Sequence, residues 1–285
     1  MKEIEKLNKY IDIEWYLNND LSVLNYYKVN KLAYRLFHSN KRFMHMKLDN
    51  KEKEFYQPNQ VNKFINPNVK NILELGCGQG ANLYYLGKMN KSVNFVGIDI
   101  HPSISKKLSN VKMIKGDFHD LSFIDDNSQD IVYAFETLCY STNKKSIFKE
   151  VNRILKPNGI FIIFDGYSKV LRDNLSDYEI KLMKLVEKGM VLDNFEYYKN
   201  IEEYANNFNF KEIKVKDLSQ YVLKNMLFFK RFVSVCMKFG IFFKLICKIA
   251  PKVFVGNAIS GYLMYEGTKE NLFCYMEHIY SKDNA

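Results

Sequence analysis

The stretch Asn71-Ile72-Leu73-Glu74-Leu75-Gly76-Cys77-Gly78-Gln79-Gly80 decides the fold of this chain. An apolar run of strand length ends in three glycines at every second position, and a helix-like stretch follows. Glycine allows positive φ angles and lets a ligand lie directly against the backbone. We therefore predict a strand, a tight turn and a helix N-terminus, which together form the entrance to a nucleotide-type pocket at the carboxyl edge of a sheet.

Glu74 discriminates between two kinds of nucleotide cofactor. The pattern Gly76-x-Gly78-x-x-Ala81 also fits a looser dinucleotide fingerprint, and Asp99 lies near the distance at which an acid binds ribose hydroxyls. However, a carboxylate two residues before the first glycine would repel a pyrophosphate. S-adenosylmethionine (SAM) carries a sulfonium and an ammonium but no phosphate, so we expect SAM. An NAD-dependent dehydrogenase is the alternative.

The next two strands supply further predicted cofactor contacts. Val96–Ile100 is predicted to be the second strand and ends with Asp99 placed for the ribose hydroxyls. Met113–Phe118 is predicted to be the third, with Asp117 accepting from the adenine amine and Phe118 flanking the ring. The complete set of predicted cofactor-binding residues is Glu74, Gly76, Gly78, Gly80, Asp99, Ile100, Asp117, Phe118 and Phe135.

From about Val69 to about Asp165 the sequence resembles a class I SAM-dependent methyltransferase, because the acid, the glycine turn, Asp99 and Gly116-Asp117 occur in that family's order. The resemblance implies a Rossmann-like α/β fold, doubly wound around a mostly parallel seven-stranded sheet. Residues 133–140 and 148–159 are similar to sterol C-methyltransferases and their small-molecule relatives. Tyr140 stands where the sterol enzymes usually carry histidine, so a sterol substrate does not follow.

The remaining pattern alternates helices and strands, as a parallel sheet requires. Asp130–Phe135 is a continuous apolar run, which is expected of a strand buried on both faces. Asn143 is predicted to cap a helix that runs through Leu155. Further helices are predicted at 3–18, 21–38, 175–189 and 201–208, and further strands at 160–165, 210–218 and within 272–281.

These elements predict one catalytic domain with a helical lid built from both ends of the chain. We divide it into an N-terminal helical cap (1–60), a SAM-binding α/β core (61–218), a helical lid insertion (219–265) and the last strand of the core (266–285). The segment Phe43-Met44-His45-Met46 loosely resembles a histidine-bearing segment that precedes the core and covers the substrate in sterol, tocopherol and related isoprenoid-type methyltransferases.

Composition bounds the function without deciding it. The 285 residues are 47% hydrophobic and carry a net charge of +10, which fits nucleic acid, a membrane surface or an anionic substrate. The five cysteines are scattered without a Cys-x-x-Cys pair, and the N-terminus is too charged for a signal peptide, so we expect reduced thiols and a cytoplasmic protein. The oligomeric state stays open.

A basic stripe marks the predicted lid between residues 226 and 250. On a continuous helix its cations span an arc of about 140°, and nearly all the remaining residues are apolar. We interpret this as a lid helix whose apolar face covers the pocket and whose basic face is solvated. The alternatives are peripheral membrane contact through 226–250 on anionic lipid, and recognition of a phosphate or carboxylate on the substrate. The cations are Lys230, Arg231, Lys238, Lys244 and Lys248.

Methyl transfer from a sulfonium is an in-line displacement that needs alignment more than acid–base chemistry. No catalytic triad and no metal-ligand spacing occurs in the sequence, so no metal is expected. If the acceptor must lose a proton, Glu136 and His45 are the candidate bases, and Tyr140 is a candidate for orienting the acceptor. The alternatives are a solvated carboxylate, a packed cap histidine and ordinary packing, respectively.

The sequence therefore predicts a SAM-dependent methyltransferase acting on a hydrophobic small molecule such as an isoprenoid, polyketide or aromatic natural product. A nucleic-acid partner is not expected, because Phe135-Glu136-Thr137-Leu138 stands where base-modifying enzymes carry an Asn-Pro-Pro-Tyr-like motif. Two alternatives remain at this stage. One is a membrane-associated lipid methyltransferase, and the other is a non-catalytic SAM-binding partner protein.

Overall fold

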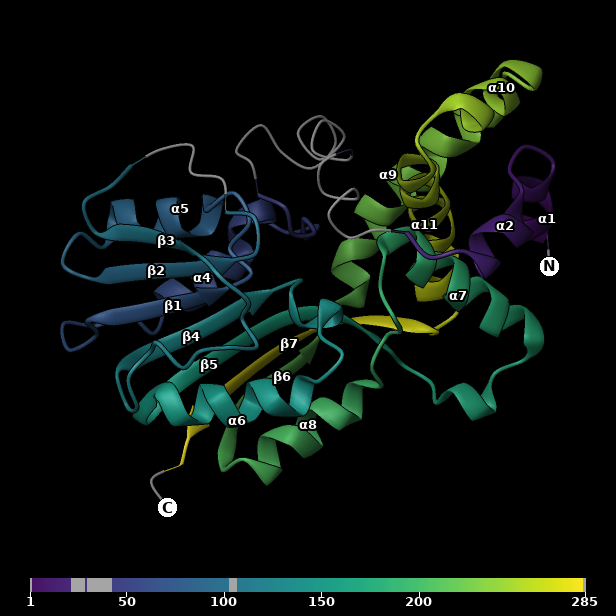
Figure 1. The fold of residues 1–285 in the computed structure, drawn as a ribbon. Coiled ribbons are helices and arrows are strands. Elements are labelled where there is room, and N and C mark those ends of the chain that lie inside the picture. Colours follow the sequence, from purple (N-terminus) through teal and green to yellow (C-terminus); the bar gives the residue numbers. More distant parts are fainter. Residues whose placement is uncertain (1, 22–28, 30–42, 103–106, 284–285) are drawn as a thin grey trace.

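The computed structural model describes residues 2–21, 29, 43–102 and 107–283, and its centre is a seven-stranded sheet (Figure 1). The strand order is β3-β2-β1-β4-β5-β7-β6. Strands β1 to β5 are parallel and β7 runs antiparallel between β5 and β6, so the predicted fold class is confirmed. The strands are β1 (Asn71–Leu75), β2 (Asn94–Asp99), β3 (Val111–Lys115), β4 (Gln129–Phe135), β5 (Leu155–Ser168), β6 (Phe210–Asp217) and β7 (Phe273–Lys282).

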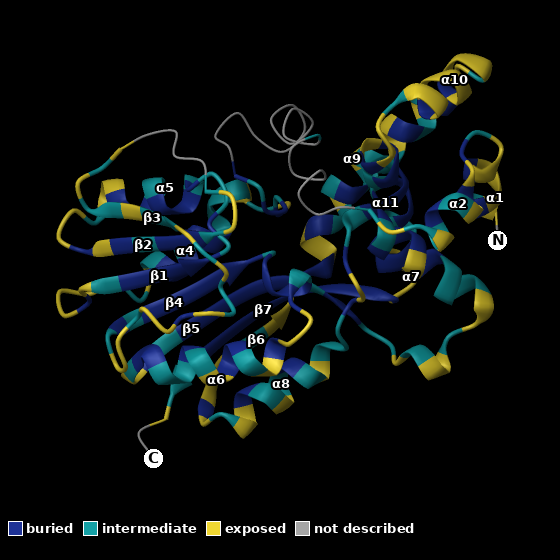
Figure 2. Ribbon diagram, viewed as in Figure 1, coloured by how far each residue is buried: buried dark blue, intermediate teal, exposed yellow. Residues whose placement is uncertain are grey.

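Helices cover both faces of the sheet, which explains why its central strands are apolar throughout (Figure 2). Ile72 of β1 belongs to the hydrophobic cluster shared with α4 and α5, whereas the next residue, Leu73, belongs to the cluster shared with α6 and α8. The four helices are α4 (Tyr56–Asn62), α5 (Ala81–Met89), α6 (Lys144–Ile154) and α8 (Tyr198–Asn207). Asn143 caps α6 as predicted, since its side chain accepts from Ser146 N.

A helical layer lies beyond one end of the sheet and combines helices from the first and the last thirds of the chain with α7 (Figure 1). Its helices share one hydrophobic cluster. They are α1 (Lys2–Asn8), α2 (Ile13–Asn18), α7 (Asp177–Met190), α9 (Ser219–Met237), α10 (Ile241–Ile249) and α11 (Lys252–Lys269). Short 3₁₀ helices are η1 (Lys53–Phe55), η2 (Leu138–Tyr140) and η3 (Arg172–Asn174). The domain boundaries stay a prediction. Helix α7 packs with this layer, although its residues fall within the predicted core at 61–218.

Several local predictions are wrong. The helix predicted at 3–18 is two helices, because Asp12 starts α2 by accepting from Trp15 N. The third strand ends at Lys115, so residues 116–118 lie in the turn that follows it. The lid segment 226–250 is also not one helix, because Gly240 separates α9 from α10 at a φ of +54°. The single basic arc therefore does not exist. The helix predicted at 21–38 lies almost entirely outside the described residues.

Candidate active site

The turn after β1 requires glycine at its first position. Gly76 has a φ of +68°, and a Cβ atom there would lie 2.3 Å from the Thr137 side chain. Gly76 N and Cys77 N both donate to Ile98 O of β2, at 2.8 and 3.0 Å. Gly78, at a φ of +51°, continues the turn toward α5. The predicted strand, turn and helix N-terminus are therefore confirmed, and the turn exposes bare backbone at the sheet edge.

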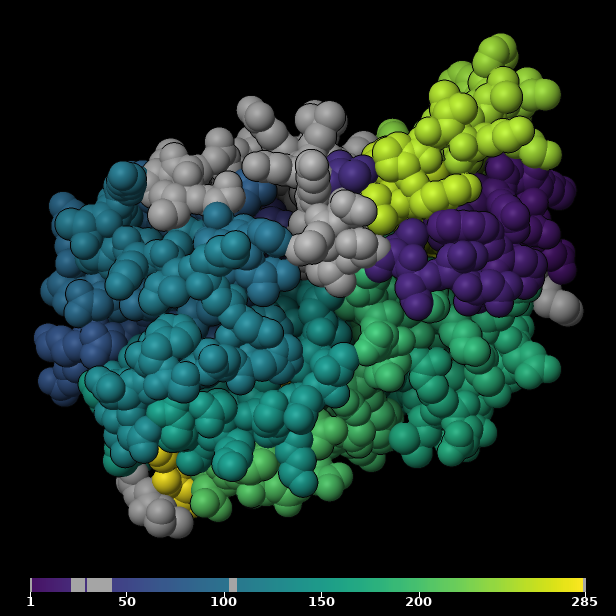
Figure 3. Space-filling model, viewed as in Figure 1, coloured from purple at the N-terminus to yellow at the C-terminus, as the bar shows by residue number. Residues whose placement is uncertain are grey.

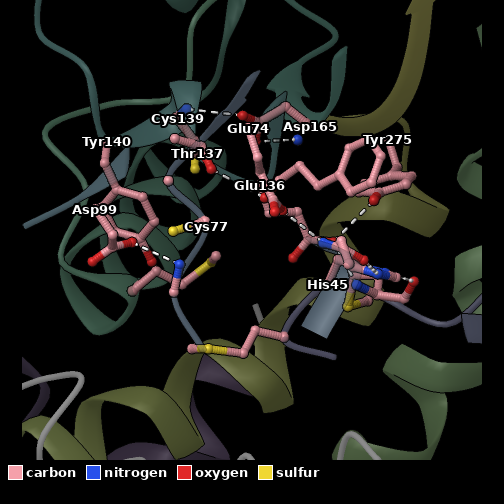
Figure 4. A pocket seen from close by; sticks show the side chains of 18 of the residues that line it. His45, Glu74, Cys77, Asp99, Glu136, Thr137, Cys139, Tyr140, Asp165 and Tyr275 are labelled. Atoms are coloured by element: carbon pink, nitrogen blue, oxygen red, sulfur yellow. Dashed lines mark hydrogen bonds between the residues drawn. The ribbon is translucent and has the colours of Figure 1, made fainter. Parts of the chain in front are cut away.

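A cavity of about 680 Å³ opens beside this turn and collects most of the predicted site residues (Figure 4). Two predicted cofactor residues, Gly80 and Asp117, are not among its lining residues. Asp117 is exposed, and its Oδ1 accepts from His119 N at 2.9 Å and contacts the His119 ring. The lining includes His45, Glu74, Gly76, Gly78, Asp99, Ile100, Phe118, Phe135, Glu136 and Tyr140.

Asp99 is fixed at the mouth of the cavity by backbone donors. Its Oδ2 accepts from Gly78 N at 2.8 Å, and its Oδ1 accepts from His101 N at 2.7 Å. Each carboxylate oxygen has a second lone pair, so Asp99 retains the capacity to accept from two hydroxyls. Asp117, in contrast, is held by His119, and its predicted contact with adenine stays a prediction.

Glu74 is buried between two side-chain donors. Asn82 Nδ2 donates to its Oε1 at 2.8 Å, and Tyr133 OH donates to its Oε2 at 3.1 Å. Burial raises the pKa of Glu74 to about 8, although both donors favour the charged form. Near neutral pH the carboxyl is therefore largely protonated until a positive charge arrives beside it.

His45 supports Glu74 through Asn82. Because Asn82 Nδ2 faces Glu74, its Oδ1 faces His45 Nε2, 3.2 Å away, so this ring nitrogen is the donor. Burial lowers the pKa of His45 to about 4, and its ring lies edge-on to Phe135 with centroids 5.7 Å apart. A neutral histidine with so low a pKa is a weak base at pH 7. The geometry favours the alternative of a packed cap histidine.

Glu136 lies at the centre of the cavity, between Asp99 and Tyr140 on one side and His45 and Tyr275 on the other (Figure 4). It follows β4 at a φ of +51°, and its Oε1 accepts from both Met46 N and Tyr275 OH. Burial, together with the nearby carboxylate of Asp165, raises its pKa to about 8, although both donors favour the charged form. Glu136 is therefore a buried acid in the pocket and not the solvated loop carboxylate of the alternative.

The part of the chain that contains the glycine turn is similar to known methyltransferases. Residues 73–163 match the family described as "Methyltransferase domain". We call residues 73–163 the methyltransferase domain after this match. The 24-methylenesterol C-methyltransferase 2 of Arabidopsis thaliana is 27% identical over 165 residues, which are 54% of this chain and 45% of that protein. A sterol 24-C-methyltransferase of Gibberella zeae is 32% identical over 135 residues, 43% of this chain and 34% of that one. The chain thus spans less than half the length of these relatives.

Solved structures extend the likeness in fold beyond the methyltransferase domain to most of the chain. The cyclopropane synthase MmaA2 from Mycobacterium tuberculosis superposes with a TM-score of 0.72 and 12% identity, over 93% of this chain and all of that one. A geranyl diphosphate C-methyltransferase from Streptomyces coelicolor gives a TM-score of 0.62 and 12% identity, over 95% and 96% of the two chains. The helical layer is therefore part of a fold that recurs in other proteins.

An apolar part of the cavity wall comes from outside the methyltransferase domain. It consists of side chains from the segment before the domain, from α7 and the loop after it, from α9 and α11, and from β7. Sulfur-bearing and aromatic side chains dominate it, which suits a nonpolar ligand of adaptable shape. Its residues are Met44, Met46, Met190, Phe195, Met226, Met264, Phe273 and Cys274.

Sequence reasoning missed several polar residues of the site. Asn82 carries a local signal, since it follows Gly80 by two residues at the N-terminus of α5. Asp165 ends the apolar core of β5, and its carboxylate is buried and accepts from Cys139 N at 3.0 Å. Tyr275 carries no local signal, because its partner Gln57, which lies outside the cavity lining, is 218 residues away in the sequence.

Proposed function

We propose that this chain transfers a methyl group from SAM to a hydrophobic small-molecule acceptor by in-line displacement. The observation that carries the proposal is the shape of one cavity. It joins the glycine turn of a methyltransferase domain to a wall of methionine and aromatic side chains. The glycine turn would bind the nucleoside, and the methionine and aromatic side chains would bind the nonpolar acceptor.

The residues at the glycine turn fit SAM. Gly76 and Gly78 leave backbone uncovered where the nucleoside would lie, and Asp99 is oriented by two backbone donors to accept from ribose hydroxyls. Glu74 would hold the positively charged end, since cation binding favours its ionised form. Ile100, Phe118 and Phe135 would surround the ring or the chain of the cofactor, with Phe118 beside the ring as predicted from the sequence.

When bound, SAM supplies an electrophilic methyl group on a sulfonium, so this chain has little covalent chemistry to perform. The buried cavity excludes water and holds the acceptor in line, which can supply an effective molarity of ~10⁵ M or more. Glu136 takes the proton where the acceptor must lose one, and Tyr140 orients that acceptor. His45 fixes Asn82 and, through it, the Glu74 carboxylate.

The acceptor in this proposal is an isoprenoid, a polyketide or an aromatic natural product. The apolar wall supports that class, and the names of the similar proteins agree with it. Two are sterol methyltransferases, and one neighbour was solved with geranyl diphosphate and S-adenosyl-L-homocysteine. We include a cytoplasmic location in the proposal, because all five cysteines are free thiols.

The decisive experiment incubates the purified protein with methyl-labelled SAM and a panel of sterol, prenyl, polyketide and aromatic acceptors. We expect label in a product heavier by one CH₂ for at least one acceptor, and loss of SAM binding in Asp99→Ala. The matched control is Asp120→Ala, since this exposed carboxylate lies outside the cavity lining. Tight SAM binding without transfer to any acceptor class supports the non-catalytic alternative, and tighter binding of NADH than of S-adenosylhomocysteine supports the dehydrogenase.

A further inference from the structure

The end of α9 and the whole of α10 expose an unusual amount of apolar surface. Large apolar side chains there are more than half exposed, although such residues normally lie in the core. This part of the chain projects from the body in Figure 1 and is the yellow-green lobe at the upper right of Figure 3. We call residues 235–249 the tip, and its exposed apolar residues are Val235, Phe239, Ile241, Phe242, Leu245, Ile246 and Ile249.

The packing of one face of α10 against the body determines which face points outward. Phe243 and Cys247 are buried one helical turn apart, and the Phe243 ring lies edge-on to Tyr10 with centroids 5.6 Å apart. The exposed residues Phe242 and Ile246 therefore point away from the body as a consequence of packing. The lid interpretation placed the apolar face on the pocket, whereas α10 presents most of its apolar side chains to the outside.

The charge around the tip has one sign. Residues 218–265 contain seven lysines and arginines and no aspartate or glutamate. Lys238, Lys244 and Lys248 are exposed, and within the described ranges no carboxylate lies within salt-bridge distance of them. Lys230, farther along α9, is instead paired with Glu266. The exposed apolar surface of the tip is thus interleaved with cations that have no counter-charge among the described residues.

We propose that the tip docks on the surface of an anionic lipid bilayer. A lipid interface offers acyl chains to Phe242 and Ile249, and phosphate groups to the lysines between them. The long side chains of these lysines let their charged ends reach the phosphates of the headgroups. In this proposal the tip lies in the interface of the bilayer. No helix among the described residues has the length and hydropathy to cross a bilayer. A protein partner would need acidic and apolar groups interleaved with matching spacing, whereas a lipid surface supplies both everywhere.

The two helices that flank the tip also form part of the pocket wall. Met226 of α9 and Met264 of α11 line the cavity, and both helices extend from there to the tip. At 1.5 Å per residue, Met226 lies about 16 Å along α9 from its last residue, Met237. A nonpolar acceptor dissolved in the bilayer would thus meet the protein close to its pocket. This delivery step rests on the proposed function, whereas docking itself does not.

The test is co-sedimentation of the full chain with vesicles, without SAM or acceptor, so that it can fail independently of the methyl transfer. We expect at least about tenfold more binding to phosphatidylglycerol/phosphatidylcholine vesicles than to phosphatidylcholine alone, and weaker binding in high salt. F242S/I246S/I249S should abolish binding to both vesicle types. K238Q/K244Q/K248Q should lose only the preference for the anionic vesicles.

The matched controls carry the same substitutions elsewhere on the surface. F123S/I213S removes two exposed apolar side chains far from the tip, and K112Q/K145Q/K149Q removes three exposed lysines. Both should bind vesicles like the wild type. The proposal is overturned if the wild type does not bind, or if the serine variant binds equally well. It is also overturned if the wild type self-associates without lipid and the serine variant is monomeric, because a second copy then covers the tip.

Discussion

Tyr275 of β7 donates its hydroxyl hydrogen to Oε1 of Glu136 across 2.9 Å, and so joins the last strand of the chain to the turn after β4. This bond favours the ionised form of Glu136, whereas burial disfavours it. The carboxyl at the centre of the cavity therefore changes between its protonated and ionised forms near pH 8. The residues around Glu136 thus determine whether it can act as a base.

If Glu136 is the base, Glu136→Gln should lower kcat by about a hundredfold or more and leave affinity for S-adenosylhomocysteine within a few-fold. In the wild type, kcat should rise with pH and level off above about 8, because the base acts only when ionised. Tyr275→Phe removes a donor to the carboxylate, so the pKa of Glu136 rises and the same profile moves to higher pH. An E136Q variant with unchanged kcat and unchanged affinity contradicts the assignment.

The raised pKa of Glu74 predicts a pH-dependent affinity for SAM. Below about pH 8 the carboxyl must release a proton before it can hold a cation, so affinity should rise by up to about tenfold per pH unit and then level off. Adenosine, which carries no cation, should bind with little pH dependence. Isothermal titration across pH 6 to 9 measures both. Glu74→Gln should flatten the SAM profile, with Glu136→Gln as the matched control, and an equally steep profile in E74Q would refute this role.

Gly76→Ala should lower the free energy of unfolding by about 2–4 kcal/mol, because the residue has a φ of +68° and its Cβ would strike Thr137. Adding Thr137→Gly should restore part of that loss by removing the collision while leaving the backbone strain. Gly261→Ala in α11 is the matched control, since its Cβ would make ordinary contact with Phe229 at 3.4 Å. Urea unfolding measures all three, and G76A as stable as G261A would contradict the prediction.

His45 should make the protein less stable in mild acid. Its pKa in the folded protein, about 4, lies below its unfolded value of 6.5, so the unfolded state binds more protons in that interval. The stability that His45 contributes is complete above pH 6.5 and falls by about 2 kcal/mol between pH 6.5 and 5. The measurement is the unfolding free energy of wild type minus that of His45→Gln, which retains an amide donor for Asn82. A difference that does not change with pH would show that His45 is not buried in its neutral form.

Much of the fold could be predicted from the sequence because its signals are local. The strand, turn and helix at 71–89 depend on glycines at fixed spacing, and the apolar runs of β4 and β5 report burial on both faces. The break at Gly240 was missed because a helical pattern of apolar residues and cations continues on both sides of it. Helical spacing predicts which residues share a face, but it does not predict where a helix bends.

The sequence by itself determined the parallel sheet, the glycine turn, and the place of Glu74, Asp99 and Glu136 at its carboxyl edge, since chain order and spacing fix these. Only the tertiary structure decided which acids are buried and therefore carry raised pKa values, because desolvation depends on what covers a side chain. It alone brought Tyr275 to Glu136, and it alone turned the apolar face of α10 outward. In each case the partner comes from a distant part of the chain, where no periodicity links the two residues.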